Sequence, residues 1–307
     1  MAEKKQNQHA YAQWHLKKFL ANKKEGNLYV AKKQETLLCE WKKKGVKKLS
    51  CSYDLHSKET EDRFTNDIDT TASLIVNNIQ DLIRDEDREG ENFTSELNSI
   101  FSKIENRRII IRYFRSINIR SAEFYRLAMP KYEEQRIKAI GERISSYYPP
   151  LYTGPYTEKQ NKYIKSLLQK PMIEWMLDDM TKNTKMLDQK YENLCFTDWE
   201  FLKYNGHMSL VLQDFISTFY YSDQTEPNDV RKFVYFPLFK DLLLRIPRVP
   251  INKMNKFKTI YYQDGEALEQ IKKINAKFIE RSQKEVYYKE EDDWILNQIS
   301  KWKPRVD

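Results

Sequence analysis

The chain of 307 residues is long enough to bury a substantial core, and its 40% hydrophobic and 32% charged residues are typical of a globular protein rather than a disordered one. No apolar run approaches the roughly 20 residues of a membrane helix, and the start MAEKKQNQHA lacks the apolar segment of a signal peptide. We therefore expect a cytoplasmic protein with no membrane partner, and the net charge of +8 favours a polyanion such as nucleic acid as the partner.

Residues 1–57 are the most basic part of the chain. The stretch QHAYAQWHLKKF predicts a short helix from about Gln8, and the alternating segments NLYVAKK and KKLSCSYDLH predict a small antiparallel β-element after it. Residues 42–48 hold five lysines, the densest positive charge in the sequence. These lysines form either a binding surface for a polyanion or a solvated loop.

Residues 58–195 are predicted to be helical. Apolar residues recur at three- to four-residue steps from Phe64 to Leu82, which predicts the first helix. A second is expected from Thr94 or Ser95 to Leu127, and a third over residues 131–145. The prolines of SSYYPPLYTGPYTEK predict a loop, and helices resume over residues 157–168 and 171–193.

Residues 196–307 mix strands and helices. TDWEFLKYNGHMSLVLQDF predicts strands around an Asn-Gly turn, KFVYFPLFKDLLLRIPR predicts a hairpin, and FKTIYYQ and KEVYYKEED predict one strand each. Helices are expected over 265–282 and in DDWILNQISKW. We therefore predict one domain over 1–307 of the α+β class, with a helical middle between an N-terminal β-element and a C-terminal mixed sheet with helices.

Two motifs stand at opposite ends of the chain. The first consists of His9, Gln13, Leu16 and Phe19, and the second of Ser222 and Asp223 after the apolar run STFYY. Their order resembles a bacterial family, the domain-of-unknown-function family 4238, over nearly the whole chain. The family's first motif is His-x-x-Pro-Gln-x-x-Leu-x-x-Phe, and Ala12 replaces its proline. The resemblance implies a single cytoplasmic unit and, by association, a phage-defence or mobile-element module.

His9 and Gln13 are the first candidates for chemistry. On the predicted helix they are four residues apart and share a face, whereas His15 points elsewhere and is expected to be an ordinary packing residue. A neutral imidazole beside a carboxamide can orient a phosphate or a water, and histidine is suited to proton transfer near neutral pH. The alternative is that His9 only braces the packed N-terminus.

Ser222 and Asp223 follow an apolar strand, and polar residues at a strand end commonly line a cleft. Asp223 could hold a divalent metal, act as a base or fix the tautomer of His9, and Ser222 could donate to a phosphate oxygen. We therefore expect the N-terminal motif to pack near this strand end. The alternative is that both residues only cap the turn after the strand.

Arg112 and Arg115 are three residues apart on a predicted helix, where guanidinium groups can grip a phosphate. The candidates for substrate binding are therefore Arg112, Arg115, Lys17, Lys43 and Lys44. The alternative for the arginines, Arg120 included, is ion pairing with the acidic first helix.

Other site motifs are missing from the sequence. Cys39, Cys51 and His56 lack the spacing of zinc ligands, and the odd number of cysteines indicates a reducing compartment. No P-loop, G-x-G-x-x-G or G-x-S-x-G occurs, which disfavours nucleotide hydrolysis, dinucleotide binding and serine hydrolysis. No metal ligand set is predicted, although a divalent cofactor stays open.

Two functions follow from these features. The first is an effector that acts on nucleic acid, a nuclease or toxin of a bacterial defence or toxin–antitoxin system. In it His9 is the acid or base, Asp223 orients it, and Arg115 neutralises phosphate charge. The alternative is a non-catalytic sensor or regulator of such a system that binds nucleic acid or a partner protein, since basic residues with interleaved Tyr and Trp suit binding equally well.

Overall fold

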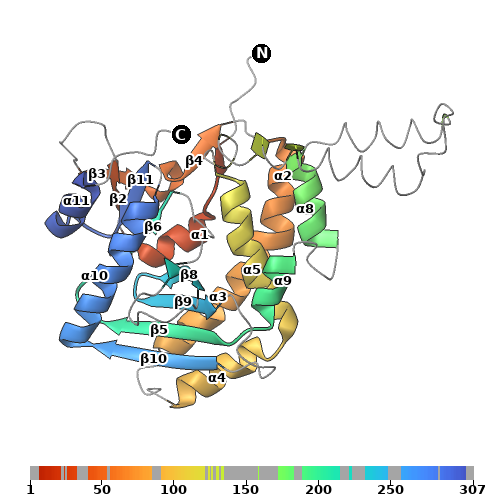
Figure 1. The fold of residues 1–307 in the computed structure, drawn as a ribbon. Coiled ribbons are helices and arrows are strands. Elements are labelled where there is room, and N and C mark those ends of the chain that lie inside the picture. Colours follow the sequence, from red (N-terminus) through yellow and green to blue (C-terminus); the bar gives the residue numbers. More distant parts are fainter. Residues whose placement is uncertain are drawn as a thin grey trace.

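The computed structural model describes most of the chain (Figure 1). The described residues are 7–21, 24, 26–32, 41–53, 56–84, 91–121, 172–182, 189–214, 221–222, 232–247, 257–282 and 284–301, with isolated positions at 124, 126, 129–130, 133–134 and 158. Helices and β-sheets both contribute, so the predicted α+β class is confirmed. The helix expected over 131–145, the loop after it and the helix over 157–168 lie almost wholly outside the described residues.

The larger sheet has five strands in the order β10-β5-β9-β8-β7. These strands are β5 (Trp199–Asn205), β7 (Tyr221–Ser222), β8 (Lys232–Phe239), β9 (Leu242–Pro247) and β10 (Phe257–Gln263). β8 and β9 form the predicted hairpin, while β5 pairs with β9 antiparallel and with β10 in parallel. Most of β9 is buried, as in a strand covered on both faces, which explains its nearly continuous apolar run.

The second sheet has four strands in the order β3-β2-β11-β6. Its strands are β2 (Asn27–Lys32), β3 (Trp41–Gly45), β6 (Leu212–Gln213) and β11 (Glu285–Tyr288). The strand predicted in NLYVAKK is confirmed as β2, but its partners are β3, which was not predicted as a strand, and the C-terminal β11, where Val30 pairs with Tyr287. The predicted pairing of β2 with KKLSCSYDLH is wrong, because residues 51–53 of that segment belong to a separate sheet. β3 is an edge strand, and its three lysines oppose edge-to-edge association.

A third, two-stranded sheet joins β1 (Asn7–His9) to β4 (Cys51–Tyr53). The short helical turns near it are α1 (Gln13–Leu16), η1 (Lys17–Phe19) and η2 (Val46–Lys48). The chain was expected to be helical from about Gln8, and this prediction is wrong. Gln8 and His9 are extended because β1 pairs with β4, and the helix begins only at Gln13.

The helical middle begins with three consecutive segments, α2 (Lys58–Arg63), η3 (Phe64–Asp69) and α3 (Thr70–Arg84). The remaining helices are α4 (Glu91–Phe101), α5 (Ile104–Ile119), α8 (Met172–Lys182), α9 (Gln189–Cys195), α10 (Asp264–Arg281) and α11 (Asp293–Ser300). In Figure 1 α10 and α11 lie on the left and α2, α5, α8 and α9 on the right, with the strands β5, β8 and β9 between them. Among the helices described, none combines the length and apolar character needed to cross a membrane.

The second predicted helix is two helices, α4 and α5, so the prediction of one continuous element to Leu127 is wrong. Lys103 has an extended backbone, with φ −77° and ψ 111°, which breaks the helix. Side chains of α5 then satisfy the last carbonyls of α4: Asn106 donates to the Ile100 oxygen and Arg107 to the Phe101 oxygen. These bonds explain why an apolar pattern that runs on can still contain a break.

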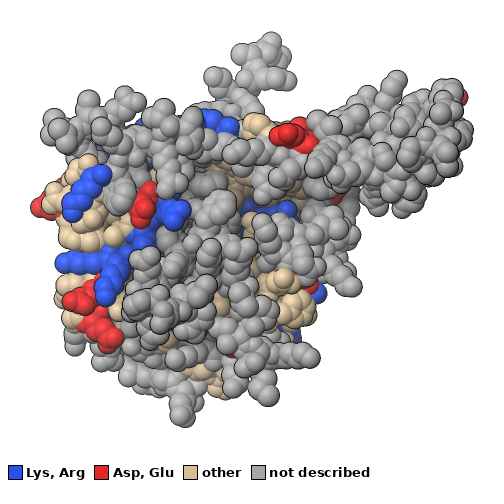
Figure 2. All heavy atoms as spheres, viewed as in Figure 1, with Lys and Arg blue, Asp and Glu red and all other residues tan. Residues whose placement is uncertain are grey.

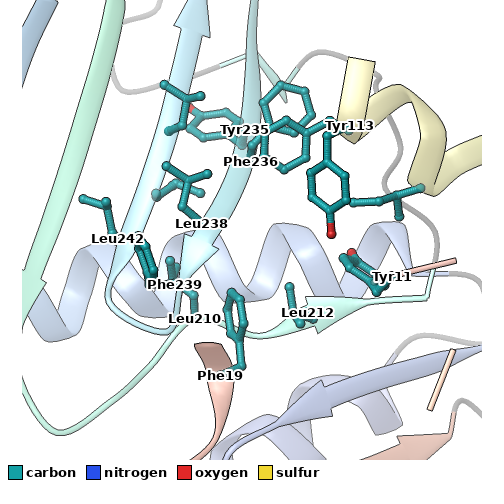
Figure 3. Close-up of a cluster of buried hydrophobic side chains, with 14 of the residues drawn as sticks. Tyr11, Phe19, Tyr113, Leu210, Leu212, Tyr235, Phe236, Leu238, Phe239 and Leu242 are labelled. Carbon is teal, nitrogen blue, oxygen red and sulfur yellow. The ribbon is translucent and has the colours of Figure 1, made fainter. Parts of the chain in front are cut away.

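The core lies between the helices and the larger sheet, where aromatic rings gather (Figure 3). Phe114 of α5 stacks on Phe236 of β8 with ring centroids 3.8 Å apart. His15 of α1 is inside this cluster, 1% exposed, between Tyr113 and the Pro237 carbonyl. Its Nε2 donates to that carbonyl at 3.0 Å, so its Nδ1 accepts from the Tyr113 hydroxyl at 2.9 Å. His15 is thus a packing residue, as expected.

Candidate active site

His9 is held at the end of β1 by hydrogen bonds on both ring nitrogens. Its Nδ1 lies 3.2 Å from the Leu49 carbonyl oxygen, and its Nε2 lies 3.3 Å from Nε2 of Gln13. A carbonyl oxygen can only accept, so the proton is on Nδ1 and the Gln13 amide donates to the lone pair of Nε2. The predicted pairing of His9 with Gln13 is therefore confirmed, although a strand, a turn and a helix start create it.

Leu49 is placed by the β1–β4 pairing. Ala10 donates its backbone N–H to the Ser50 oxygen at 2.9 Å, which brings the segment before β4 alongside the segment after β1. Ser50 has a positive φ of 49°, an uncommon backbone conformation for a residue other than glycine. The turn at Ser50 thus directs the preceding carbonyl of Leu49 at His9.

A buried charge network lies beside His9. Arg120, at the end of α5, donates to both carboxylate oxygens of Asp69 at 2.8 and 2.9 Å, and its side chain is 1% exposed. The second acidic member is Glu61 of α2, whose oxygens lie 3.9 Å from Arg120 and 2.7 Å from Nε2 of His56. This network ties the first helical segments to α5, as the alternative interpretation of Arg120 predicted.

The network also anchors β1. The Gln8 side chain donates to the His56 carbonyl oxygen at 2.5 Å and accepts from the His56 backbone N–H at 3.1 Å. Gln8 is the immediate neighbour of His9, so β1 is fixed at both faces, by His56 through Gln8 and by Leu49 through His9. His9 therefore has little freedom to reorient.

A wide helical turn presents Asp69. η3 is π-helical, an uncommon conformation that occurs mostly as single turns and often at functional sites. The extra residue in this turn rotates the faces of α2 and α3 relative to each other, so that Glu61 and Asp69 both reach Arg120. The ring of Phe64, which opens the same turn, lies under the guanidinium of Arg120 at 5.0 Å.

Burial and charge set the protonation of these groups in different directions. Burial lowers the pKa of His9 below 6.5, and the Leu49 carbonyl and Glu61 oppose this only in part, so the ring is neutral at neutral pH. Burial raises the pKa of Asp69 against the effect of Arg120. For Arg120 burial lowers the pKa, but Asp69, Glu61 and Tyr113 together outweigh it, so the pKa rises. The two-pronged geometry is that of an ionised pair.

The segment 42–48, with its five lysines, leads directly to Leu49 and so to this site. η2 packs against α1, and Leu49, which anchors His9, directly follows the exposed Lys47 and Lys48. Lys17, directly after α1, is exposed as well. Lys43 and Lys44 project from β3 instead, where Lys43 lies over the Tyr29 ring at 5.8 Å and Lys44 lies 3.7 Å from Glu285.

The other predicted site residues lie elsewhere or outside the description. Arg112 pairs with Glu105 of its own helix at 2.9 Å, and the guanidinium of Arg115 is buried over the Tyr191 ring at 4.9 Å. Ser222 ends β7 at an edge of the five-stranded sheet, and Asp223 lies outside the described residues. Their roles, and the packing of this strand end near His9, stay predictions.

Sequence reasoning did not identify four members of the network, Gln8, His56, Glu61 and Asp69. A weak signal for Asp69 exists, since it directly follows Ile68 in the apolar stripe of the first helix. Within the part of the chain that the structure covers, no three His, Cys, Asp or Glu side chains are arranged to hold a metal ion.

Comparison with known proteins supports the resemblance seen in the sequence. The family model described as "Protein of unknown function (DUF4238)" matches residues 7–292, which include the charge network and all three sheets. Neither the curated proteins nor the solved structures gave a match. Because the matching region spans nearly the whole chain, this protein belongs to the DUF4238 family.

Proposed function

We propose that this protein cleaves phosphodiester bonds of nucleic acid with His9 as the general base. The observation that carries the proposal is the pair of hydrogen bonds on its ring: the Leu49 carbonyl holds the proton on Nδ1, and the lone pair of Nε2 is directed at the Gln13 amide. Such an orienting bond is what a histidine base needs to accept a proton at one defined nitrogen.

The lowered pKa of His9 supports the same role, because it keeps the imidazole in its basic form at neutral pH. In the proposed step, a hydroxyl of the substrate or a water replaces the Gln13 amide at Nε2 and transfers its proton there. Gln13 then serves as a positioning residue, since its carboxamide keeps hydrogen-bonding capacity toward a phosphate or hydroxyl oxygen.

The exposed Lys47 and Lys48 supply the positive charge in this proposal. They directly precede Leu49, so a phosphate that they bind lies next to the His9 anchor. We prefer them to Arg115 for this role, because Arg115 is only 6% exposed and packs on Tyr191 of α9. Lysine binds phosphate as a point charge, which suits a backbone contact without sequence preference.

His9→Ala is expected to lower the cleavage rate about a hundredfold or more, because general base catalysis contributes at least this much. The measurement is the rate of cleavage of end-labelled RNA and DNA, with and without a divalent metal. His207→Ala is the matched control, because His207 is exposed on the turn after β5. Equal rates for wild type and a folded His9→Ala variant would contradict the assignment of the base.

The double variant Lys47→Gln, Lys48→Gln is expected to bind single-stranded nucleic acid more weakly. The slope of log K against log salt concentration should become shallower by about 1 to 2, because each phosphate contact that is lost leaves about one counterion unreleased. The matched control removes the same charge with Lys273→Gln and Lys301→Gln. On the face in Figure 2, acidic side chains lie beside the basic ones over α10 and α11, so we expect weaker attraction of phosphate there. Equal slopes for both double variants would contradict the proposal that Lys47 and Lys48 contact phosphates.

The second candidate is a non-catalytic binder of nucleic acid, which the same exposed lysines favour. It predicts gel retardation without cleavage, weakened by salt and unchanged in His9→Ala.

We also propose that the protein acts in the bacterial cytoplasm as the effector of a defence or toxin–antitoxin module. Growth arrest on expression in a bacterial host that is lost with His9→Ala would support the toxic enzyme, whereas arrest by both forms would argue for the binder.

A further inference from the structure

We infer that the substrate is RNA and that the nucleophile is its own 2′-hydroxyl, deprotonated by Nε2 of His9. This inference rests on the proposed function and names its substrate class. It follows from what the structure describes around His9: one oriented base, one carboxamide and exposed cations, with the two described carboxylates, Glu61 and Asp69, engaged by other side chains.

Glu61 and Asp69, the carboxylates that the structure describes beside His9, are poorly placed to activate a water. Asp69 gives both oxygens to Arg120 and is 5% exposed, and Glu61 binds His56 at 2.7 Å with one oxygen while the other faces Arg120. Diverting Asp69 from this network would deprive the buried Arg120 of its two-pronged partner. Attack by water needs a group that holds the water in line, whereas a 2′-hydroxyl is held in place by the substrate itself.

The carboxamide of Gln13 suits this nucleophile. It already donates to Nε2 of His9 at 3.3 Å, so a hydroxyl bound at that nitrogen also lies within reach of the amide. The amide offers both a donor and an acceptor, and the 2′-hydroxyl is itself both. A site that recognises this group discriminates RNA from DNA at the point of cleavage.

The reaction then balances without a further reactant. Nε2 of His9 takes the 2′-hydroxyl proton, and the 2′-oxygen forms a bond to phosphorus. The bond from phosphorus to the 5′-oxygen breaks, and that oxygen takes the proton of the His9 imidazolium, directly or relayed through one water. The products are a 2′,3′-cyclic phosphate and a free 5′-hydroxyl, and His9 returns to its neutral form.

The test uses the wild-type full-length protein and chemically altered substrates. The probes are one RNA oligonucleotide, its DNA counterpart, and the same RNA with a single 2′-deoxy nucleotide at the mapped cleavage position. We expect cleavage of the RNA alone, loss at the 2′-deoxy position only, and an end group lighter by one water than a linear phosphate in mass spectrometry. His9→Gln should lose this cleavage, and His207→Ala should keep it.

Other outcomes separate this inference from the proposal beneath it. Cleavage of DNA at a similar rate, cleavage at the 2′-deoxy position or a linear phosphate end would overturn the RNA inference, while cleavage that still depends on His9 would leave the general base in place. Cleavage of neither polymer by the folded wild-type protein would overturn both. A melting profile of each variant shows whether a loss of activity reflects loss of fold.

Discussion

Replacing Arg120 with methionine is expected to lower the free energy of unfolding by about 3–5 kcal/mol, the usual cost of breaking a buried ion pair from one side. Arg120 is 1% exposed and holds both oxygens of Asp69, so its loss leaves a carboxylate buried without its partner. The guanidinium contact with the Phe64 ring is lost as well. Denaturant unfolding of wild type and variant, followed by the loss of helical circular dichroism, measures the change.

Two comparisons locate the cause of this effect. Lys32→Met breaks a pair with Glu285 in which the lysine side chain is 51% exposed, and it should cost less than about 1 kcal/mol. The double variant Arg120→Met with Asp69→Leu should be more stable than Arg120→Met alone, because no carboxylate is then left facing an empty position. If Arg120→Met lowers the free energy of unfolding no more than Lys32→Met does, the network does not hold η3 against α5.

Acidification is expected to destabilise the fold through His15 by about 3 kcal/mol between pH 6.5 and pH 4. Burial lowers the pKa of His15 from 6.5 to about 4, with the Pro237 carbonyl opposing it. The folded protein therefore binds this proton less readily than the unfolded chain. The stability is fully present above pH 6.5 and declines as the pH falls toward the folded pKa, at about 1.4 kcal/mol for each pH unit.

The variant His15→Gln tests this coupling, because glutamine can donate and accept in the same place but does not titrate. We expect it to be less stable than wild type at pH 7, with a flatter decline between pH 6.5 and pH 4. Carboxylates titrate in both proteins, so only the difference between the two curves reports on His15. His207→Gln, at an exposed position, should run parallel to wild type. Parallel curves for His15→Gln would show that the buried imidazole is not the acid-sensitive group.

Local elements of the fold could be predicted because short patterns specify them. The hairpin of β8 and β9 is two apolar runs separated by Lys240 and Asp241, and α10 has its apolar residues on one face. Patterns of this kind report which side of an element is buried. They do not report what covers it, so nothing in NLYVAKK indicated that β2 pairs with β11.

The candidate site was predicted in part. His9 and Gln13 were predicted to lie together, and their contact is present. It is not made within one helix, because His9 ends a strand and Gln13 begins a helix after an intervening turn. Gln8 forms a hydrogen-bonded pair with His56, far along the chain, and a polar residue of this kind has no periodicity that marks its partner. Asp69 lies within the apolar pattern that predicted an ordinary helix. The pattern did not reveal the π-helical turn, because a single such turn leaves the spacing of apolar residues nearly unchanged.

By itself the sequence determined the family, the α+β class and most of the strands and helices that the structure describes, because these depend on local spacing and composition. Only the tertiary structure decided that Leu49 orients His9 and that Glu61 and Asp69 share Arg120. The physical reason is that these contacts join residues far apart in the chain. Whether a polar group is paired, buried or charged depends on the partner that folding brings to it, which spacing along the sequence does not encode.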